Sequence, residues 1–286
     1  MYDIETEEFS DLFLQAWQIA ALNVQEEMEK YNRIKFNFNT KSEIPPAEEM
    51  EKYTCRWIKA YPTTPSFEHF TFSCKNRIFC VLIQIQDGKG SASITPWHIK
   101  NLIETCEENN LTPCIYPLDV NDLENPDMET LSPVSPGWNL FDPMTHKPVN
   151  VPEIVSDEPV LMSKWEFHDL AIKIVRTHIE EKLKKKVFSF QNVLGLDPQI
   201  WFCDEDGKNK SWVIVRHSVY PAKEPEEKTT AELLETVKGN VNRRGNTVYQ
   251  GYTAKVKFMA SDGAEDKSRI YRSALITADF DDIEKA

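Results

Sequence analysis

Apolar residues recur at intervals of three and four positions in two long stretches of the chain, and both stretches open alike. One begins at residues 8–12 (EFSDL) and continues to about Tyr31, and the other begins at residues 166–170 (EFHDL). This spacing is typical of an amphipathic helix with one buried face. Ser163 stands three residues before Glu166, which is a capping-box pattern and predicts where the second helix begins.

Each predicted helix is followed by two apolar runs of strand length with turn residues between them. Residues 70–74 and 78–85 form such a pair in the first half, and residues 199–203 and 211–219 form one in the second. Both patterns predict β-hairpins. The run at 78–85 is almost continuously apolar, so we expect a central strand that is covered on both faces.

A further helix and a further strand follow each hairpin. Thr95 with Pro96 starts the helix in the first half, and Thr229 with Thr230 starts the one in the second. Residues 113–118 then form a strand that contains prolines. We expect this strand to lie at the edge of its sheet, or its prolines to stand only at the strand ends. In the second half, residues 252–258 and 271–277 alternate as an antiparallel pair.

The shared element order predicts a mixed α+β fold with two units. Each unit is a helix, a β-hairpin, a helix and a strand, arranged as a small sheet flanked by helices. The units span residues 1–120 and 161–286, and a proline-started helical insert near residues 45–60 lengthens the first. Internal duplication explains the match between the halves. The alternative is coincidence, because the motif itself is only five residues long.

Residues 121–160 differ from both units because they are rich in proline and turn residues. We interpret them as the connection between the units. Trp138, Leu140 and Phe141 lie within this segment and predict that it packs across a surface.

The charge of the chain argues against several classes of partner. With 46 acidic and 33 basic side chains the net charge is −13, and such a field repels nucleic acids. The basic run at Lys182–Lys186 complements the carbonyl end of a predicted helix. No apolar run approaches the roughly 20 residues of a membrane span, and the first residues contain no apolar signal segment. We therefore expect a cytoplasmic protein with a basic protein partner, or an acidic surface that serves solubility alone.

The cysteine pattern indicates neither a zinc site nor any other cofactor. Six cysteines are present, without any C-x-x-C pair, and zinc ribbons and fingers need closely paired thiolates. Several lie in apolar strand or helix patterns, where a free cysteine behaves as a small buried hydrophobic residue. We expect reduced thiols and no cofactor.

Asp197-Pro198 and the strand that follows invite a comparison with nucleases. The element order resembles the core of the restriction-endonuclease-like PD-(D/E)-x-K family. That resemblance implies Mg²⁺ held by carboxylates on adjacent strands, with a nearby lysine. Asp197 stands where the first carboxylate would lie, but Ile214-Val215-Arg216 replaces acid-x-Lys, and residues 83–86 of the first half contain no acid. The catalytic pattern is absent, and a turn before proline is the favoured interpretation of Asp197.

Other motifs give weaker signals. Asp204–Gly207 begins like a calcium loop, but its glycine is fourth instead of sixth, and Asp-Gly between two strands favours a hairpin turn. The histidines show no ligand spacing, and a satisfied structural role is the favoured interpretation of His168 and His178. Candidate partner-binding residues are a polar pair near a strand end and three aromatic residues with the character of contact residues: Arg216, His217, Trp138, Tyr249 and Tyr252. The alternative for Trp138 is that it pins the connection onto a domain.

These patterns lead to one expected function and two alternatives. We expect a non-catalytic, acidic protein that binds another protein, in a toxin-neutralising or regulatory role. The first alternative is a divalent-metal-dependent, nuclease-like enzyme with a displaced site at Glu180, Asp197 and Asp204. The second is a structural homodimer that pairs through its last strand, near Tyr271.

Overall fold

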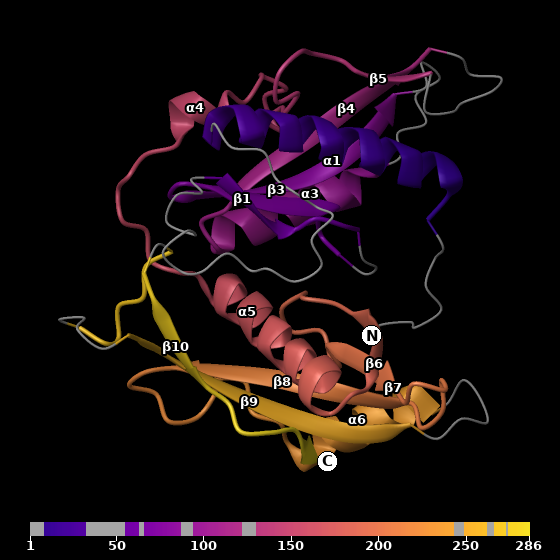
Figure 1. The fold of residues 1–286 in the computed structure, drawn as a ribbon, viewed down its shortest axis with the longest axis vertical. Helices are drawn as coiled ribbons and strands as arrows, with labels where there is room; N and C mark the ends of the chain where they lie inside the picture. The colour runs from indigo at the N-terminus through magenta and orange to yellow at the C-terminus, as the bar shows by residue number, and fades with distance from the viewer. Residues whose placement is uncertain are drawn as a thin grey trace. The chain divides into compact units, whose positions relative to one another are not determined.

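The computed structural model describes residues 9–32, 55–62, 66–86, 94–121, 130–242, 249–261, 266–272 and 274–286 (Figure 1). These residues form two compact units. The N-terminal unit comprises residues 7–62 and 67–158, and the C-terminal unit begins at Pro159 and ends at Ala286. Both contain helices and a mixed sheet, which confirms the predicted α+β class.

The N-terminal unit is a five-stranded sheet with helices on both faces. Its elements are α1 (Asp11–Asn32), β1 (Cys55–Lys59), β2 (Phe70–Cys74), β3 (Arg77–Gln86), α3 (Pro96–Glu108), β4 (Thr112–Val120), β5 (Leu131–Pro133) and α4 (Val151–Ile154). The strand order is β1-β2-β3-β4-β5, and only the β3–β4 pairing is parallel. Helix α1 lies across one face of the sheet and α3 on the other (Figure 1). Strand β3 is central and buried along most of its length, as predicted.

The C-terminal unit repeats this plan with an extended sheet. Its elements are α5 (Lys164–Thr177), the π-helical turn η1 (His178–Lys182), β6 (Lys186–Phe190), β7 (Ile200–Cys203), β8 (Ser211–Val219), α6 (Ala231–Asn242), β9 (Gln250–Ala260), β10 (Ile276–Asp279) and β11 (Glu284–Lys285). The order is β10-β9-β8-β7-β6, with β11 also on β9 and a parallel β8–β9 pairing. Alternate residues of β8 separate two cores: Val213 and Val215 pack with α5, and Trp212 and Ile214 pack with α6.

The two units share a buried hydrogen bond at equivalent positions. In the N-terminal unit the backbone N–H of Ile83 donates to Nδ1 of His69, at 2.8 Å. In the C-terminal unit the N–H of Val215 donates to Oε1 of Gln199, also at 2.8 Å. Each of these side chains stands just before the second strand of its sheet and ties that position to the third strand. Duplication of the units stays a prediction, and this bond adds to the matching order of elements.

The predicted helices outside residues 45–60 are confirmed, and three of them begin where the sequence indicates. Thr95 caps α3 and Ser163 caps α5, in both cases as a reciprocal capping box with the residue three positions later. Helix α6 begins just after Thr230, as expected. In α3 the partner of Thr95 is His98, whose Nδ1 accepts from the Thr95 backbone N–H at 3.0 Å.

The helical insert predicted near residues 45–60 is wrong where the structure describes it. Residues 55–59 form strand β1, which pairs antiparallel with β2. The physical reason is side-chain packing: the ring of Trp57 lies edge-on to Phe70 and Phe72, with centroids 5.7 and 6.2 Å apart. Residues 45–54 lie outside the described part of the chain.

Strand β4 lies inside the sheet, which corrects the prediction that prolines place it at an edge or stand only at its ends. Pro117 is internal and lies opposite Gln84 of β3. On the other side, β5 pairs only with residues 118–120 of β4. Beyond that short pairing, a side chain supplies the hydrogen bond: Nδ2 of Asn139 donates to the carbonyl of Pro117, at 2.7 Å. A short neighbour and a side-chain donor therefore accommodate the proline.

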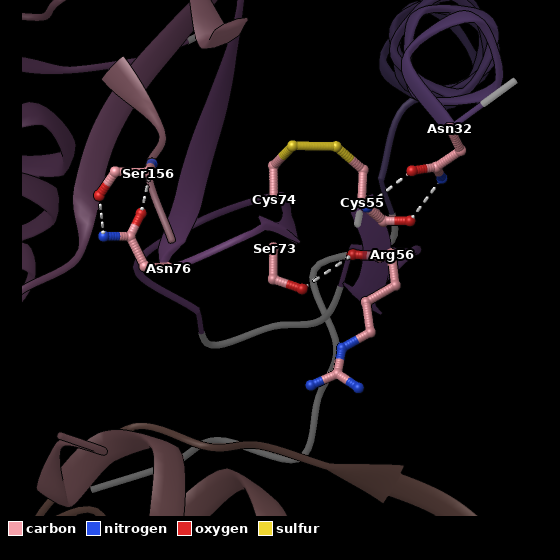
Figure 2. The surroundings of a disulfide bond; sticks show 7 residues. All are labelled: Asn32, Cys55, Arg56, Ser73, Cys74, Asn76 and Ser156. Carbon is pink, nitrogen blue, oxygen red and sulfur yellow. Dashed lines mark hydrogen bonds between the residues drawn. A yellow bond between two sulfur atoms is a disulfide. The ribbon is translucent and has the colours of Figure 1, made fainter. Parts of the chain in front are cut away.

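Residues 130–158 of the proline-rich segment pack within the N-terminal unit. The Trp138 ring stacks on Phe72 with centroids 5.6 Å apart. Near the end of the segment, the side chains of Asn76 and Ser156 hydrogen bond at 2.8 Å, and the Ser156 N–H donates to Asn76 Oδ1 at 2.9 Å (Figure 2). These contacts attach the segment to the turn between β2 and β3.

A disulfide joins Cys55 of β1 to Cys74 of β2, which lie opposite each other in the sheet (Figure 2). The prediction that the thiols are reduced is therefore wrong for these two residues, because antiparallel register brings them together. The other four cysteines are free and buried. Next to the disulfide, the side-chain amide of Asn32 hydrogen bonds both the N–H and the carbonyl of Cys55, at 2.9 and 2.8 Å. The end of α1 is thus fastened to the edge strand.

Reduction of this disulfide should destabilise the N-terminal unit. The bond closes a loop with a sequence separation of 19, and constraining a loop of that length in the unfolded chain contributes about 3 kcal/mol. We expect dithiothreitol to lower the free energy of unfolding by about that amount in urea titrations. The double variant C55A/C74A should show no further effect of reductant. An equal response of both proteins to reductant would contradict the assignment.

Candidate functional site

A pocket of about 220 Å³ opens in the C-terminal unit between α5, the end of β8 and the loop that follows β8. Helix α5 contributes Lys164, Phe167 and His168 to its lining. Strand β8 contributes residues 215–219, and the loop contributes three glutamates, Glu224, Glu226 and Glu227. The lining therefore includes Arg216 and His217, the polar pair that the sequence indicated near a strand end.

Arg216 and Asp197 form a buried ion pair beside this pocket. The two terminal nitrogens of Arg216 donate to the two carboxylate oxygens of Asp197, at 2.8 and 2.6 Å. Nε2 of Gln199 adds a third hydrogen bond to Asp197 at 2.8 Å. Burial alone raises the pKa of Asp197, but the hydrogen bonds and charge of Arg216 outweigh burial and hold this pKa below its usual value. Asp197 is therefore a carboxylate already bound by its neighbours.

Two neutral histidines lie in the pocket wall. The rings of His168 and His217 have centroids 5.9 Å apart. Burial lowers the pKa of each from 6.5 to about 4. At neutral pH both imidazoles are therefore uncharged. His168 is only 3% exposed, and its Nε2 has no hydrogen-bond partner among the residues that the structure describes. His168 lines the pocket, and the fold leaves this buried atom without a partner among the described residues.

The neighbouring polar residues of α5 have partners. Glu166 accepts two hydrogen bonds from Arg272, at 2.9 and 3.0 Å. Asp169 accepts from the side chain of Asn192 at 2.9 Å. These contacts hold α5 from both sides and determine how the pocket face of the helix is oriented.

The structure does not bring together the three residues of the predicted metal site. Glu180 is exposed on η1, Asp197 is paired with Arg216, and Asp204 forms an ion pair with Lys185 near the hairpin turn. Across the described ranges, no group of three or more His, Cys, Asp or Glu side chains is placed to hold a metal ion. Of these candidates only Asp197 lies near the pocket.

The aromatic candidates lie elsewhere. Trp138 is only 8% exposed, and its stacking on Phe72 supports the alternative that it pins the proline-rich connection onto the N-terminal unit. Tyr249 packs against the cluster around Trp201 and Trp212. The ring of Tyr252, on β9, lies 5.7 Å from that of Phe202. None of the three lines the pocket.

Sequence reasoning found Arg216 and His217 but missed His168 and the glutamate loop as parts of a site. The available signal was the polar run Glu166, His168 and Asp169 inside a helix with a buried face. The strand predicted at residues 271–277 is wrong in its bounds: β10 spans only Ile276–Asp279, and Tyr271 lies outside it, in an isolated bridge with Leu161.

Comparison with known proteins adds a single match. Residues 165–286 match a family model described as "Domain of unknown function (DUF8840)". The matched region includes most of the pocket lining. No curated protein and no solved structure shows a significant match. Among the described helices, none is long and apolar enough to cross a membrane.

The buried neutral state of His168 should make stability depend on pH. Because its pKa falls from 6.5 to about 4 on folding, the unfolded chain binds more protons between these pH values. The contribution of His168 to the free energy of unfolding is therefore constant above pH 6.5, and it decreases as the pH falls from 6.5 towards 4. We expect a loss of roughly 3 kcal/mol from this group, measured by urea unfolding across the window.

The variant H168Q serves as the comparison because glutamine does not titrate. Its stability should fall less between pH 7 and 4 than that of the wild-type protein. If the variant does not fold, an NMR titration of the wild-type His168 ring should show no protonation near pH 6. Parallel pH profiles, or a ring that titrates near 6.5, would contradict the burial argument.

Proposed function

We propose that this protein is a non-catalytic binding protein that engages a basic protein partner through its N-terminal unit. The distribution of charge carries the proposal. Residues 7–158 contain 24 acidic and 12 basic side chains, whereas residues 1–6 and 159–286 together contain 22 and 21. The negative charge of the chain thus belongs to one unit, and complementary charge between partners raises association rates and selects the partner. A toxin-neutralising or regulatory role is consistent with such a surface.

The exposed face of α3 is the surface that we assign to this contact. Trp97, Lys100, Glu104, Glu107 and Glu108 follow one another at helical spacing, and we call this set the α3 stripe. Trp97 is 65% exposed, and tryptophan is among the residues that dominate interface energies. An aromatic residue with three carboxylates on one helix face suits a partner that presents basic side chains around an apolar pocket.

The position of the carboxylates in α3 supports a role beyond local stability. Glu107 and Glu108 stand in the last turn, and that turn contains no basic residue. Negative charge at the carbonyl end of a helix is unfavourable because it opposes the helix dipole. Within α3 the one lysine is Lys100, whose Nζ lies 3.6 Å from Glu104. A helix stabilised for its own sake would carry the opposite charge there.

Substitutions in the α3 stripe should weaken partner capture and leave the fold intact. We expect W97A to weaken binding by about 2 kcal/mol, or roughly thirtyfold. The variant E104K/E107K should reverse the local charge and remove the salt dependence of capture. The measurement is capture of the partner from a native-host lysate at increasing salt concentrations. Mass spectrometry identifies the bound protein, and its amount gives the stoichiometry.

The matched control is E235K on α6, because Glu235 is also an exposed helical glutamate but lies in the C-terminal unit. It should capture the same partner as the wild-type protein. A partner that is acidic, or one that binds E104K/E107K as well as E235K, would overturn the proposal.

We retain the cytoplasm as the proposed location, and the Cys55–Cys74 disulfide supplies its test. Disulfides are uncommon in reducing compartments, so the Cys55–Cys74 disulfide counts against the cytoplasm unless the pair is reduced in the native host. If the protein is cytoplasmic, rapid alkylation in the native host, followed by intact-mass analysis, should label Cys55 and Cys74. Protection of this pair in freshly trapped protein would instead indicate an oxidising compartment. A C55A/C74A variant calibrates the labelling of the four remaining cysteines.

A further inference from the structure

An unsatisfied polar atom in the pocket of the C-terminal unit requires an explanation. His168 lines the pocket, and its Nε2 is buried and has no hydrogen-bond partner within the described residues. Buried polar groups in folded proteins are nearly always hydrogen bonded. The uncharged ring accepts a hydrogen bond at Nε2 when its proton is on Nδ1. A ligand that donates a hydrogen bond would therefore complete this site.

The charges around the pocket favour a cation. Arg216 is neutralised by both oxygens of Asp197. Nζ of Lys164 lies 2.8 Å from Glu227 and 3.9 Å from Glu226, and the side chain of Glu226 is 87% exposed. Lys164 therefore engages Oε1 of Glu227 more closely than it engages Glu226. A carboxylate has two oxygens that each accept hydrogen bonds, so an entering cation can share Glu227 with this lysine.

The same preference holds at the position of His168. Burial is the main effect that lowers the pKa of this residue, but the charges of Glu227 and Asp169 act in the opposite direction and exceed the effect of Arg216. The local field therefore favours positive charge, and only the loss of water keeps the imidazole neutral. A cation that enters from solvent and keeps part of its hydration avoids most of that penalty.

The remaining lining suits an alkyl chain. Phe167 and Val219 line the pocket and also belong to the apolar core or pack against it. A short methylene chain can lie along them, and the face of an aromatic ring attracts a nearby ammonium group.

We propose that this pocket binds a primary ammonium group on a short alkyl chain, either a lysine side chain or a free alkylamine. The ammonium donates to Nε2 of His168 and shares the carboxylate of Glu227 with Lys164, and the chain contacts Phe167 and Val219. The site lies in the C-terminal unit and is independent of the binding function proposed for the α3 stripe.

Three probes of equal length test the chemistry with the full chain. We expect n-butylamine at millimolar concentration to raise the melting temperature, because a ligand that binds only the folded state stabilises it. Butyrate and n-butanol should not. NMR shift changes with butylamine should centre on Phe167, His168 and Val219. No response to the amine, or an equal response to butanol, would overturn the proposal, the latter by indicating an apolar cavity alone.

Two substitutions locate the interaction. E227Q removes the carboxylate charge from a partly exposed position and should weaken amine binding about tenfold, the usual effect of losing a charge-assisted hydrogen bond. E235Q, on exposed α6, should bind as the wild-type protein does. Equal amine affinity of E227Q and E235Q would contradict the assigned site. Variants of the α3 stripe should bind butylamine normally, so failure of one proposal is distinguishable from failure of the other.

A final comparison separates the two sources of ammonium. If the occupant is a protein side chain, Nα-acetyl-lysine methylamide should bind more tightly than butylamine, because its backbone adds contacts at the rim. If the occupant is a free amine, butylamine should bind more tightly than the bulkier lysine derivative. Either order supports an ammonium site. Binding of Nα-acetyl-norleucine methylamide, which lacks the amine, as tightly as the lysine derivative would count against such a site.

Discussion

The buried ion pair between Asp197 and Arg216 connects the parts of the C-terminal unit that form the pocket. Removing both charges from water costs several kcal/mol per ion, and only close, bidentate hydrogen bonding offsets this. Asp197 precedes β7 and Arg216 lies in β8, so the pair links a loop to the central strand. Gln199 completes the link, because it donates to Asp197 and accepts from the backbone of β8. Pocket geometry thus depends on a carboxylate that is fully engaged in structure.

Much of the architecture could be predicted from periodicity and capping residues. Helices α1 and α5 have long apolar faces, and Thr95 and Ser163 mark helix starts through interactions three residues away. Strands β1 and β6 were missed because each is only five residues long and incompletely buried. For β1 the preceding prolines and glutamates also favoured a helix. Its strand character comes from pairing with β2, which is a tertiary contact that no local pattern contains.

The candidate site was predictable only in part. Arg216 and His217 were found because polar residues near a strand end often line clefts. The pairing of Arg216 with Asp197 spans 19 positions of sequence, and nothing in either segment identifies the other as its partner. His168 was interpreted as a satisfied helical residue because its missing hydrogen bond is visible only in three dimensions. The net charge likewise described the whole chain, although the excess of acid belongs to the residues of one unit.

The hydrogen bond shared by the two units has a consequence for how each responds to protons. His69 and Gln199 accept from equivalent backbone N–H groups, those of Ile83 and Val215, at the same distance, so this position requires an acceptor of suitable reach and not a particular residue. Burial lowers the pKa of His69 to about 3, and the ring loses its acceptor when Nδ1 is protonated. Glutamine has no such limit. The two units thus make the same hydrogen bond with different side chains. Strong acid removes the bond to His69 by protonating the ring and leaves the bond to Gln199 intact.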